Sequence, residues 1–146
     1  MSIETKLAEL GITLPDAPAP AANYVPYVIT GNLLFVSGQI SGAKGRLGAD
    51  LAVEEGAEAA RGCGLALLAQ ARAALGSLDR VVRVVKLTGF VNSTAEFTDQ
   101  PEVINGCSNL MVEVFADKGR HARAAVSAPA LPRGVAVEIE AIFEFA

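Results

Sequence analysis

The stretch Val135-Ala-Val-Glu-Ile-Glu-Ala-Ile-Phe-Glu-Phe145 decides the fold of this chain. Apolar residues occupy every second position along it, and Glu138, Glu140 and Glu144 stand between them, with Ile142 as the exception. Successive side chains of a β-strand point to opposite faces of a sheet. The alternation therefore predicts a strand with one apolar face, turned to a core, and one acidic face.

The residues before this strand predict four more strands and three helices. Gly31-Asn32 separates two apolar runs as a tight turn does, and Pro101 suits the first position of a helix. The valine-rich run at 80–92 predicts a strand covered on both faces. We expect strands at residues 24–30, 33–40, 80–92, 121–127 and 135–145, and helices at 2–10, 50–75 and 101–118.

The longest predicted helix, at 50–75, is rich in alanine, glycine and leucine. Its apolar residues recur at three- and four-residue steps, and Asp50 is expected to cap its start. Each interior glycine costs about 1 kcal/mol relative to alanine, so Gly56, Gly62 and Gly64 indicate a backbone that lies close to a sheet. Beyond the first short helix, the order is ββ-α-β-α-ββ with helices on one face of an amphipathic sheet, which predicts an α+β fold.

The chain has 146 residues, the size of one compact domain. A proline-rich connector, Leu14-Pro-Asp-Ala-Pro-Ala-Pro20, disfavours helix because the residue before each proline avoids the α region. It predicts an N-terminal helical and extended appendage at 1–17 joined to a main domain at 18–146.

Composition excludes several classes of function. The net charge is −4, with only 12 lysines and arginines, and the basic stripe that nucleic-acid binding requires is missing. Cys63 and Cys107 have neither a CxxC spacing nor a neighbouring histidine, so no metal site is expected. Without a signal-peptide pattern or a membrane-length apolar run, we expect a cytoplasmic protein that binds neither nucleic acid nor membrane and needs no cofactor.

Four motifs fall in the order and spacing of a known family. The motif His121-Ala-Arg-Ala-Ala-Val126 is followed by Leu131-Pro132 and by the final strand, as in the C-terminal signature of the RidA (YjgF) family. The other three are Val25-Pro-Tyr27, Leu34-Phe-Val-Ser-Gly-Gln-Ile40 and Val84-Val-Lys-Leu-Thr-Gly-Phe-Val91. Residues 18–146 thus resemble this family.

The resemblance implies a chorismate-mutase-like homotrimer with a six-stranded sheet, two helices packed on one face and a cleft at each subunit interface. Members hydrolyse reactive 2-imino and 2-enamino acids, such as 2-aminoacrylate and its imine tautomer, to 2-oxo acids and ammonia. The family arginine that clamps the substrate carboxylate falls on Arg123, and the glutamate that positions water falls on Glu138. Tyr27, Ser37 and Asn105 fall on further pocket positions.

The residue types suit this chemistry. A guanidinium pairs both oxygens of a carboxylate, and Arg123 stands among small or apolar neighbours, where it needs either a buried partner or an anion. The alternative is an arginine paired with a carboxylate of its own chain. Glu138 and Glu140 share a strand face, which raises the pKa of one of them and suits proton transfer near neutral pH. The alternative for both is a solvated face or a subunit interface.

The other site residues have structural alternatives, and three positions depart from the family. Tyr27 could pack against a helix and Ser37 could satisfy a backbone carbonyl. Where the family has glutamine, proline and cysteine, this chain has Ile29, His121 and Ala125. Catalysis through a thiol is therefore not expected.

Two rival functions remain at this stage. One is a non-catalytic trimer that binds or senses a small carboxylate through the same arginine. The other is ribonuclease activity, which the single histidine and the negative net charge disfavour.

Overall fold

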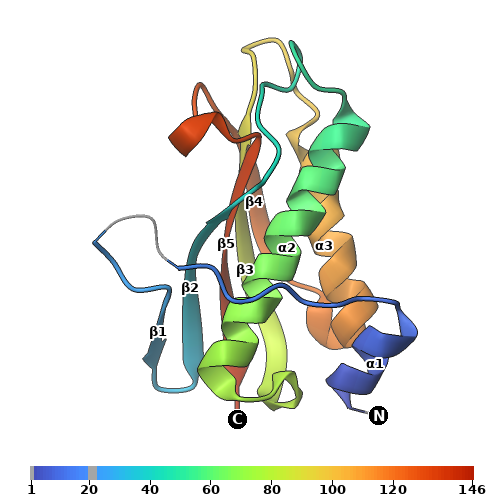
Figure 1. Cartoon of the computed structure of the whole chain (residues 1–146), viewed down its shortest axis with the longest axis vertical. Helices are drawn as coiled ribbons and strands as arrows, with labels where there is room; N and C mark the ends of the chain where they lie inside the picture. The colour runs from blue at the N-terminus through green and yellow to red at the C-terminus, as the bar shows by residue number, and fades with distance from the viewer. Residues whose placement is uncertain (1, 20–22) are drawn as a thin grey trace.

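The computed structural model describes residues 2–19 and 23–146. Its strands form one mixed sheet in the order β1-β2-β5-β3-β4 (Figure 1). β3 and β4 pair in parallel and the other neighbours are antiparallel. The strands are β1 (Tyr27–Thr30), β2 (Leu33–Ile40), β3 (Val81–Asn92), β4 (Ala122–Ala128) and β5 (Val137–Phe145).

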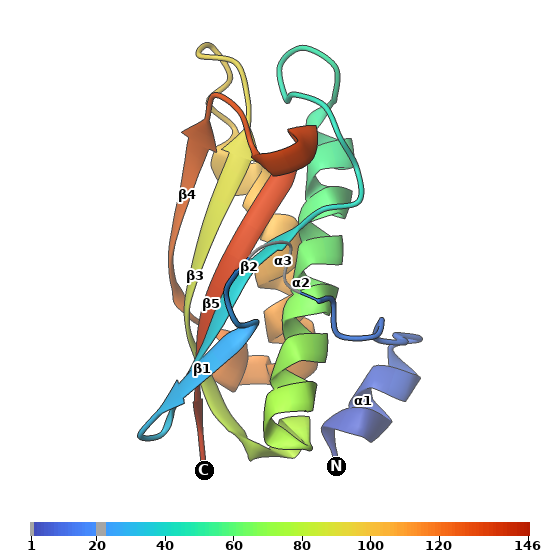
Figure 2. The same cartoon turned by 60° about the vertical axis from the view of Figure 1, so that its left-hand side comes forward.

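Helices cover one face of this sheet, as predicted (Figure 2). They are α1 (Ile3–Glu9), α2 (Val53–Leu75) and α3 (Gln100–Phe115), accompanied by short 3-10 turns at Leu78–Arg80, Ala116–Gly119 and Pro132–Gly134. The α+β class is therefore confirmed. In the described part of the chain, no helix is both long and apolar enough to span a membrane.

The strand count corrects the implied six-stranded sheet, because residues 2–19 and 23–146 contribute five strands. The segment between β2 and α2 makes only isolated β-bridges, from Lys44 to Val135 and from Leu47 to Ser93. Gly45 and Gly48 have φ angles of 120° and 88° in this segment. Such left-handed conformations interrupt an extended strand, so no sixth strand forms here.

The start of the long helix is also corrected. α2 begins at Val53, with Ala52 at its N-cap, and Asp50 does not cap it. The Asp50 carboxylate instead accepts a hydrogen bond from the backbone N–H of Arg46 at 3.0 Å. The Ala52 N–H donates to Glu55 Oε1 at 2.9 Å. Asp50 is therefore engaged in closing the loop that precedes α2, although its residue type predicted a helix cap.

The core lies between the helices and the sheet. Alternate residues of β5 face the helices and are almost fully buried, among them Val137, Ile139 and Phe143. The sequence had predicted that β3 is covered on both faces, and within the described chain this is wrong. The face opposite the helices is uncovered (Figure 2), and apolar Phe35 and Val126 on it are 40% and 44% exposed.

The N-terminal residues pack on the helical layer. Leu7 and Leu14 belong to the core cluster, and the backbone N–H of Ile3 donates to Asp79 Oδ1 at 2.7 Å. Leu7 is 2% exposed. α1 therefore adds apolar burial to the same core as α2 and α3.

Replacing Gly106 by alanine is expected to destabilise the fold by about 2–4 kcal/mol. A Cβ at Gly106 would clash with the backbone carbonyl oxygen of Ala57, so α2 and α3 would have to move apart, which is an overpacking cost in a dense core. Urea unfolding measures the loss. Gly62→Ala is the matched control, since its Cβ would meet no atom within 4 Å. An equally stable Gly106→Ala variant would contradict this close helix packing.

Candidate functional site

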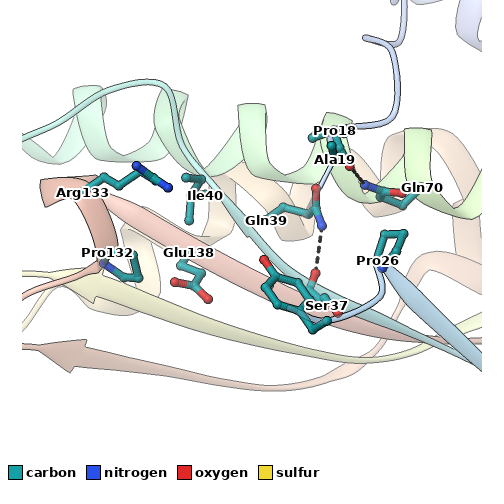
Figure 3. A pocket seen from close by; sticks show the side chains of 12 residues that line it. Pro18, Ala19, Pro26, Ser37, Gln39, Ile40, Gln70, Pro132, Arg133 and Glu138 are labelled. Carbon is teal, nitrogen blue, oxygen red and sulfur yellow. Dashed lines mark hydrogen bonds between the residues drawn. The ribbon is translucent and has the colours of Figure 1, made fainter. Parts of the chain in front are cut away.

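A pocket of about 630 Å³ opens beside the C-terminal half of β2 (Figure 3). Its apolar lining includes Pro18, Ala19, Pro26, Ile40 and Pro132. Its polar lining is supplied by Tyr24, Ser37, Gln39, Gln70, Arg133 and Glu138. The pocket thus combines a single carboxylate with amide, hydroxyl and guanidinium groups and a largely apolar wall.

Glu138 reaches this pocket from the face of the sheet opposite the helices. It lies on β5 between Ile40 of β2 and Phe90 of β3. Burial raises the pKa of the Glu138 carboxyl, and the charge of Glu140 raises it further. A carboxyl shifted in this direction can hold or release a proton closer to neutral pH.

Gly38 lets the Glu138 carboxylate approach the backbone of β2. An added Cβ at Gly38 would collide with Glu138 Oε2. The register of β2 against β5 shifts between Val36 and Gln39, and Gly38 lies within this irregularity. The glycine therefore leaves room for the carboxylate at this place in the pocket.

Ser37 also lines the pocket, and its side chain is held by the backbone. Its hydroxyl donates to the carbonyl oxygen of Val25 at 2.8 Å. The side-chain amide of Gln39 donates to the carbonyl oxygen of Ser37 at 2.9 Å. Ser37 thus ties the residues before β1 to β2, and it keeps the capacity to accept a hydrogen bond.

Arg123 lies outside this pocket, on the edge strand β4, where it faces α3. Its Nη1 donates to Asn105 Oδ1 at 2.9 Å and to Ser108 Oγ at 3.1 Å. Its Nη2 donates to the carbonyl oxygen of Pro101 at 3.2 Å. All three acceptors are neutral, and none of the ion pairs within residues 2–19 and 23–146 involves Arg123.

The positive charge of Arg123 is therefore positioned but not neutralised. A guanidinium has five N–H groups, and the three hydrogen bonds to α3 leave the Nε–H and one Nη2–H unused within the described chain. The Nε–H lies on one edge of the planar fork that pairs with a carboxylate. The arrangement suits an external organic acid.

His121 and Ser108 orient this network. Ser108 Oγ accepts from Arg123, so its own O–H is available to donate to His121 Nε2 at 2.8 Å. His121 Nδ1 then donates to the carbonyl oxygen of Gly119 at 2.6 Å. These two hydrogen-bond directions require that His121 is neutral. Burial lowers the pKa of His121 and the nearby Arg123 charge lowers it further, while the Gly119 carbonyl opposes the shift.

We expect folding to become less stable with falling pH through His121. The folded-state pKa lies below the ordinary value of 6.5, so the unfolded chain binds the proton first. The stabilisation is complete above 6.5 and is lost as pH falls toward the folded-state pKa. His121→Phe should flatten the dependence of unfolding free energy on pH below about 6.5. An unchanged slope in urea titrations would contradict this coupling.

The structure separates the predicted site residues into two groups and one isolated residue. Ser37 and Glu138 line the pocket, whereas Arg123 and Asn105 meet at the contact between β4 and α3. Tyr27 pairs with Val36 and packs against the core, outside the pocket lining.

Arg123 and Glu138 lie on opposite faces of one sheet. Arg123 is in register with buried Leu87, whereas Glu138 is in register with Phe90 on the uncovered face. β3 separates their strands, so the two strand axes lie about 10 Å apart, and the residues are also offset along the strands, at the levels of Leu87 and Phe90. Within one chain, therefore, the two groups of residues, called half-sites below, do not face a common pocket.

Sequence reasoning missed several residues of these half-sites. Ser108 and the Pro101 carbonyl hold Arg123, and neither carries a sequence signal because their role depends on how α3 packs. Gln70 is 1% exposed in the middle of α2, and a polar residue on the apolar face of a helix was the one signal available. Arg133 has a left-handed backbone, with φ 59° and ψ 15°, which its residue type does not reveal.

The two cysteines take no part in either half-site. Both are fully buried, as the sequence predicted. Burial is the main cause that raises the pKa of Cys63 to about 12, and it raises the pKa of Cys107 further. Within residues 2–19 and 23–146, no group of three histidine, cysteine, aspartate or glutamate side chains could hold a metal ion.

Comparison with known proteins places the chain in one family. The model of the family described as "YjgF/chorismate mutase-like, putative endoribonuclease" matches residues 4–144. The chain is 52% identical to Protein TCP17 of Trypanosoma cruzi, covering 97% of this chain and 93% of that protein. It is 36% identical to the RutC family protein y4sK of Sinorhizobium fredii, covering 90% and 94%.

Solved structures agree. The protein Atu1372 of Agrobacterium tumefaciens, whose function is described as unknown, is 49% identical, with a TM-score of 0.92 over 99% of this chain and 92% of that chain. A structure from Shewanella oneidensis described as a "putative endoribonuclease" is 32% identical, with a TM-score of 0.96 over 99% and 100%. Escherichia coli TdcF with bound serine is 26% identical, with a TM-score of 0.65 over 89% and 94%.

Proposed function

Because this chain belongs to the YjgF (RidA) family, we propose that it is a deaminase for reactive 2-imino and 2-enamino acids. The reaction adds water to the C=N carbon and releases the nitrogen as ammonia, leaving a 2-oxo acid. An enamine such as 2-aminoacrylate first takes a proton on its terminal carbon to become the imine. The balance needs only water, so no cofactor is called for.

Arg123 is the observation that carries the proposal. Its guanidinium is partly buried, held by three neutral acceptors, and retains two N–H groups for an anion. A positioned cation without a counter-charge suits a ligand carboxylate. We place the substrate carboxylate there, with Asn105 and Ser108 as the residues that orient the arginine.

Glu138 supplies the proton transfer in this proposal. Its raised pKa, caused first by burial and then by Glu140, suits a group that takes a proton from the attacking water and returns one to the leaving nitrogen. Ser37 lies in the same pocket and can accept a hydrogen bond from the imine N–H. Such imines hydrolyse slowly unaided, so positioning and protonation suffice.

Because the two half-sites do not meet within one chain, we propose that the protein assembles as a homotrimer. The uncovered sheet face carries Phe35, Ile40 and Val126, each more than a third exposed, beside Glu138. An exposed apolar face of this kind marks an interface. Because Arg123 lies on the edge strand β4, we place it at the rim of such an interface, next to the pocket of a neighbouring chain.

Binding without catalysis is the second candidate. Its support is that the related TdcF was solved with bound serine, a small carboxylate, and that Arg123 alone explains such binding. The ribonuclease description attached to some relatives has less support in this chain, because a net charge of −4 disfavours contact with RNA phosphates.

The test combines assembly and activity. 2-Iminopropionate is generated from alanine by an amino-acid oxidase, residual imine is trapped with semicarbazide, and light scattering gives the mass. We expect a trimer that clears the imine faster than buffer. A trimer that shifts its melting temperature with pyruvate but clears no imine would leave binding alone. A monomer would remove the shared site.

A further inference from the structure

We infer that residues 14–19 form a specificity wall that favours 2-imino acids with bulky apolar side chains over the alanine-derived imine. This inference rests on the proposed function, and it concerns which substrate the pocket of Glu138 accepts. It assigns a role to the segment that connects α1 to the sheet.

The wall is fastened at both ends of the segment. Leu14 is 8% exposed and belongs to the core cluster. Further along, the side-chain amide of Gln70 donates to the carbonyl oxygen of Pro18 at 2.6 Å. Gln70 is 1% exposed on α2, so its side-chain amide is sheltered from water although Pro18 is exposed. The segment is therefore held against the pocket by α2.

The wall contributes apolar side chains to the pocket, beside the polar side chains of Tyr24, Gln39 and Gln70. Pro18 and Ala19 line it from this segment, and Pro26 continues the lining toward β1. Proline and alanine side chains have no hydrogen-bonding atoms, so a substrate side chain gains here by burying apolar surface. A charged side chain would find no opposite charge in the wall and would lose part of its hydration there.

The position of the wall fits the distal end of a substrate. Figure 3 shows Pro18 and Ala19 toward one end of the pocket, Pro132 and Arg133 toward the other, and Glu138 nearer the second group. With the reacting carbon at Glu138, the substrate side chain extends along Gln39 toward the wall. The volume of about 630 Å³ is in the range that holds ligands much larger than an alanine-derived imine.

The test compares imines generated from leucine, phenylalanine and alanine. In the wild type, we expect kcat/KM for the leucine- and phenylalanine-derived imines to exceed that for 2-iminopropionate. Ala19→Phe should lower kcat/KM about tenfold for the two larger substrates and keep kcat/KM for 2-iminopropionate within about twofold of the wild type. This size follows from the loss of a side-chain contact of about 1.4 kcal/mol. Gln70→Met, which releases Pro18, should reduce the same preference.

Ala17→Phe is the matched control, because Ala17 is exposed in the same segment and does not line the pocket. Its substrate preference should equal the wild type, and melting temperatures show which variants fold. Equal losses on all three substrates in Ala19→Phe would overturn the wall, while the deaminase activity stands. If the wild type hydrolyses no imine, the proposed function fails instead. In that case, calorimetry tests the specificity wall by ligand binding. Equal affinities for 4-methyl-2-oxopentanoate and pyruvate would overturn it.

Discussion

Arg123→Ala is expected to lower kcat/KM for 2-iminopropionate by about 10²–10³-fold. Removing one partner of a desolvated charge pair typically costs 2–5 kcal/mol, and the guanidinium is the group that holds the carboxylate in our proposal. Most of the loss should appear in KM if the carboxylate contact is equally strong in the ground state, and in kcat if it orients the imine for attack. Steady-state kinetics with the semicarbazide assay separates the two.

Arg123→Lys tests whether charge or shape matters. Lysine keeps the charge but lacks the planar fork, and it cannot reproduce the hydrogen bonds to Asn105, Ser108 and Pro101 together. We expect it to recover less than a tenth of the wild-type kcat/KM. Arg120→Ala is the matched control, since the Arg120 side chain lies in an exposed ion pair with Asp117 at 3.5 Å and does not line the pocket. A folded Arg123→Ala trimer with wild-type kinetics would end the deaminase proposal.

Glu138→Gln is expected to lower kcat by about 10²-fold with little change in KM. Proton transfer by a positioned side chain contributes about 10²–10⁴-fold, and the lower end applies because imines also hydrolyse unaided. Glutamine preserves the shape of the side chain beside Gly38 but cannot exchange a proton. The pH profile of kcat should therefore lose the limb that the carboxyl of Glu138 controls.

The same variant should be more stable than the wild type at neutral pH. The folded-state pKa of Glu138 lies above its ordinary value of 4.5, so the folded chain binds the proton more tightly. The stability from this group is present below 4.5 and is lost as pH rises through the folded-state pKa. Glutamine carries no charge at neutral pH, so the variant does not lose this stability. The melting temperature should rise by no more than about 3 °C, because the carboxyl is only partly buried.

Glu140→Gln is the control for both effects. Glu140 shares the strand face of Glu138 but is exposed, and it does not line the pocket. It should retain kcat within about threefold, since the main cause of the raised pKa of Glu138 is burial. If Glu140→Gln lost as much activity as Glu138→Gln, the assignment of proton transfer to Glu138 would be wrong.

The sequence by itself determined the fold class and the two charged groups of the site. The alternation in β5 is a local property, because side-chain direction along a strand has a period of two, and the burial of Val137, Ile139 and Phe143 confirms it. The helices followed equally from local spacing and from Pro101. Arg123 and Glu138 were identified by motif and by residue type, and their catalytic roles stay predictions.

Only the tertiary structure decided how those groups are arranged. The parallel pairing of β4 with β3 turns Arg123 toward α3, and the antiparallel pairing of β5 turns Glu138 to the uncovered face. Register and strand order arise from contacts between segments far apart in the chain, so no local pattern reports them. The same holds for Ser108 beneath Arg123 and for Gln70 against Pro18, because each hydrogen bond joins two separate elements.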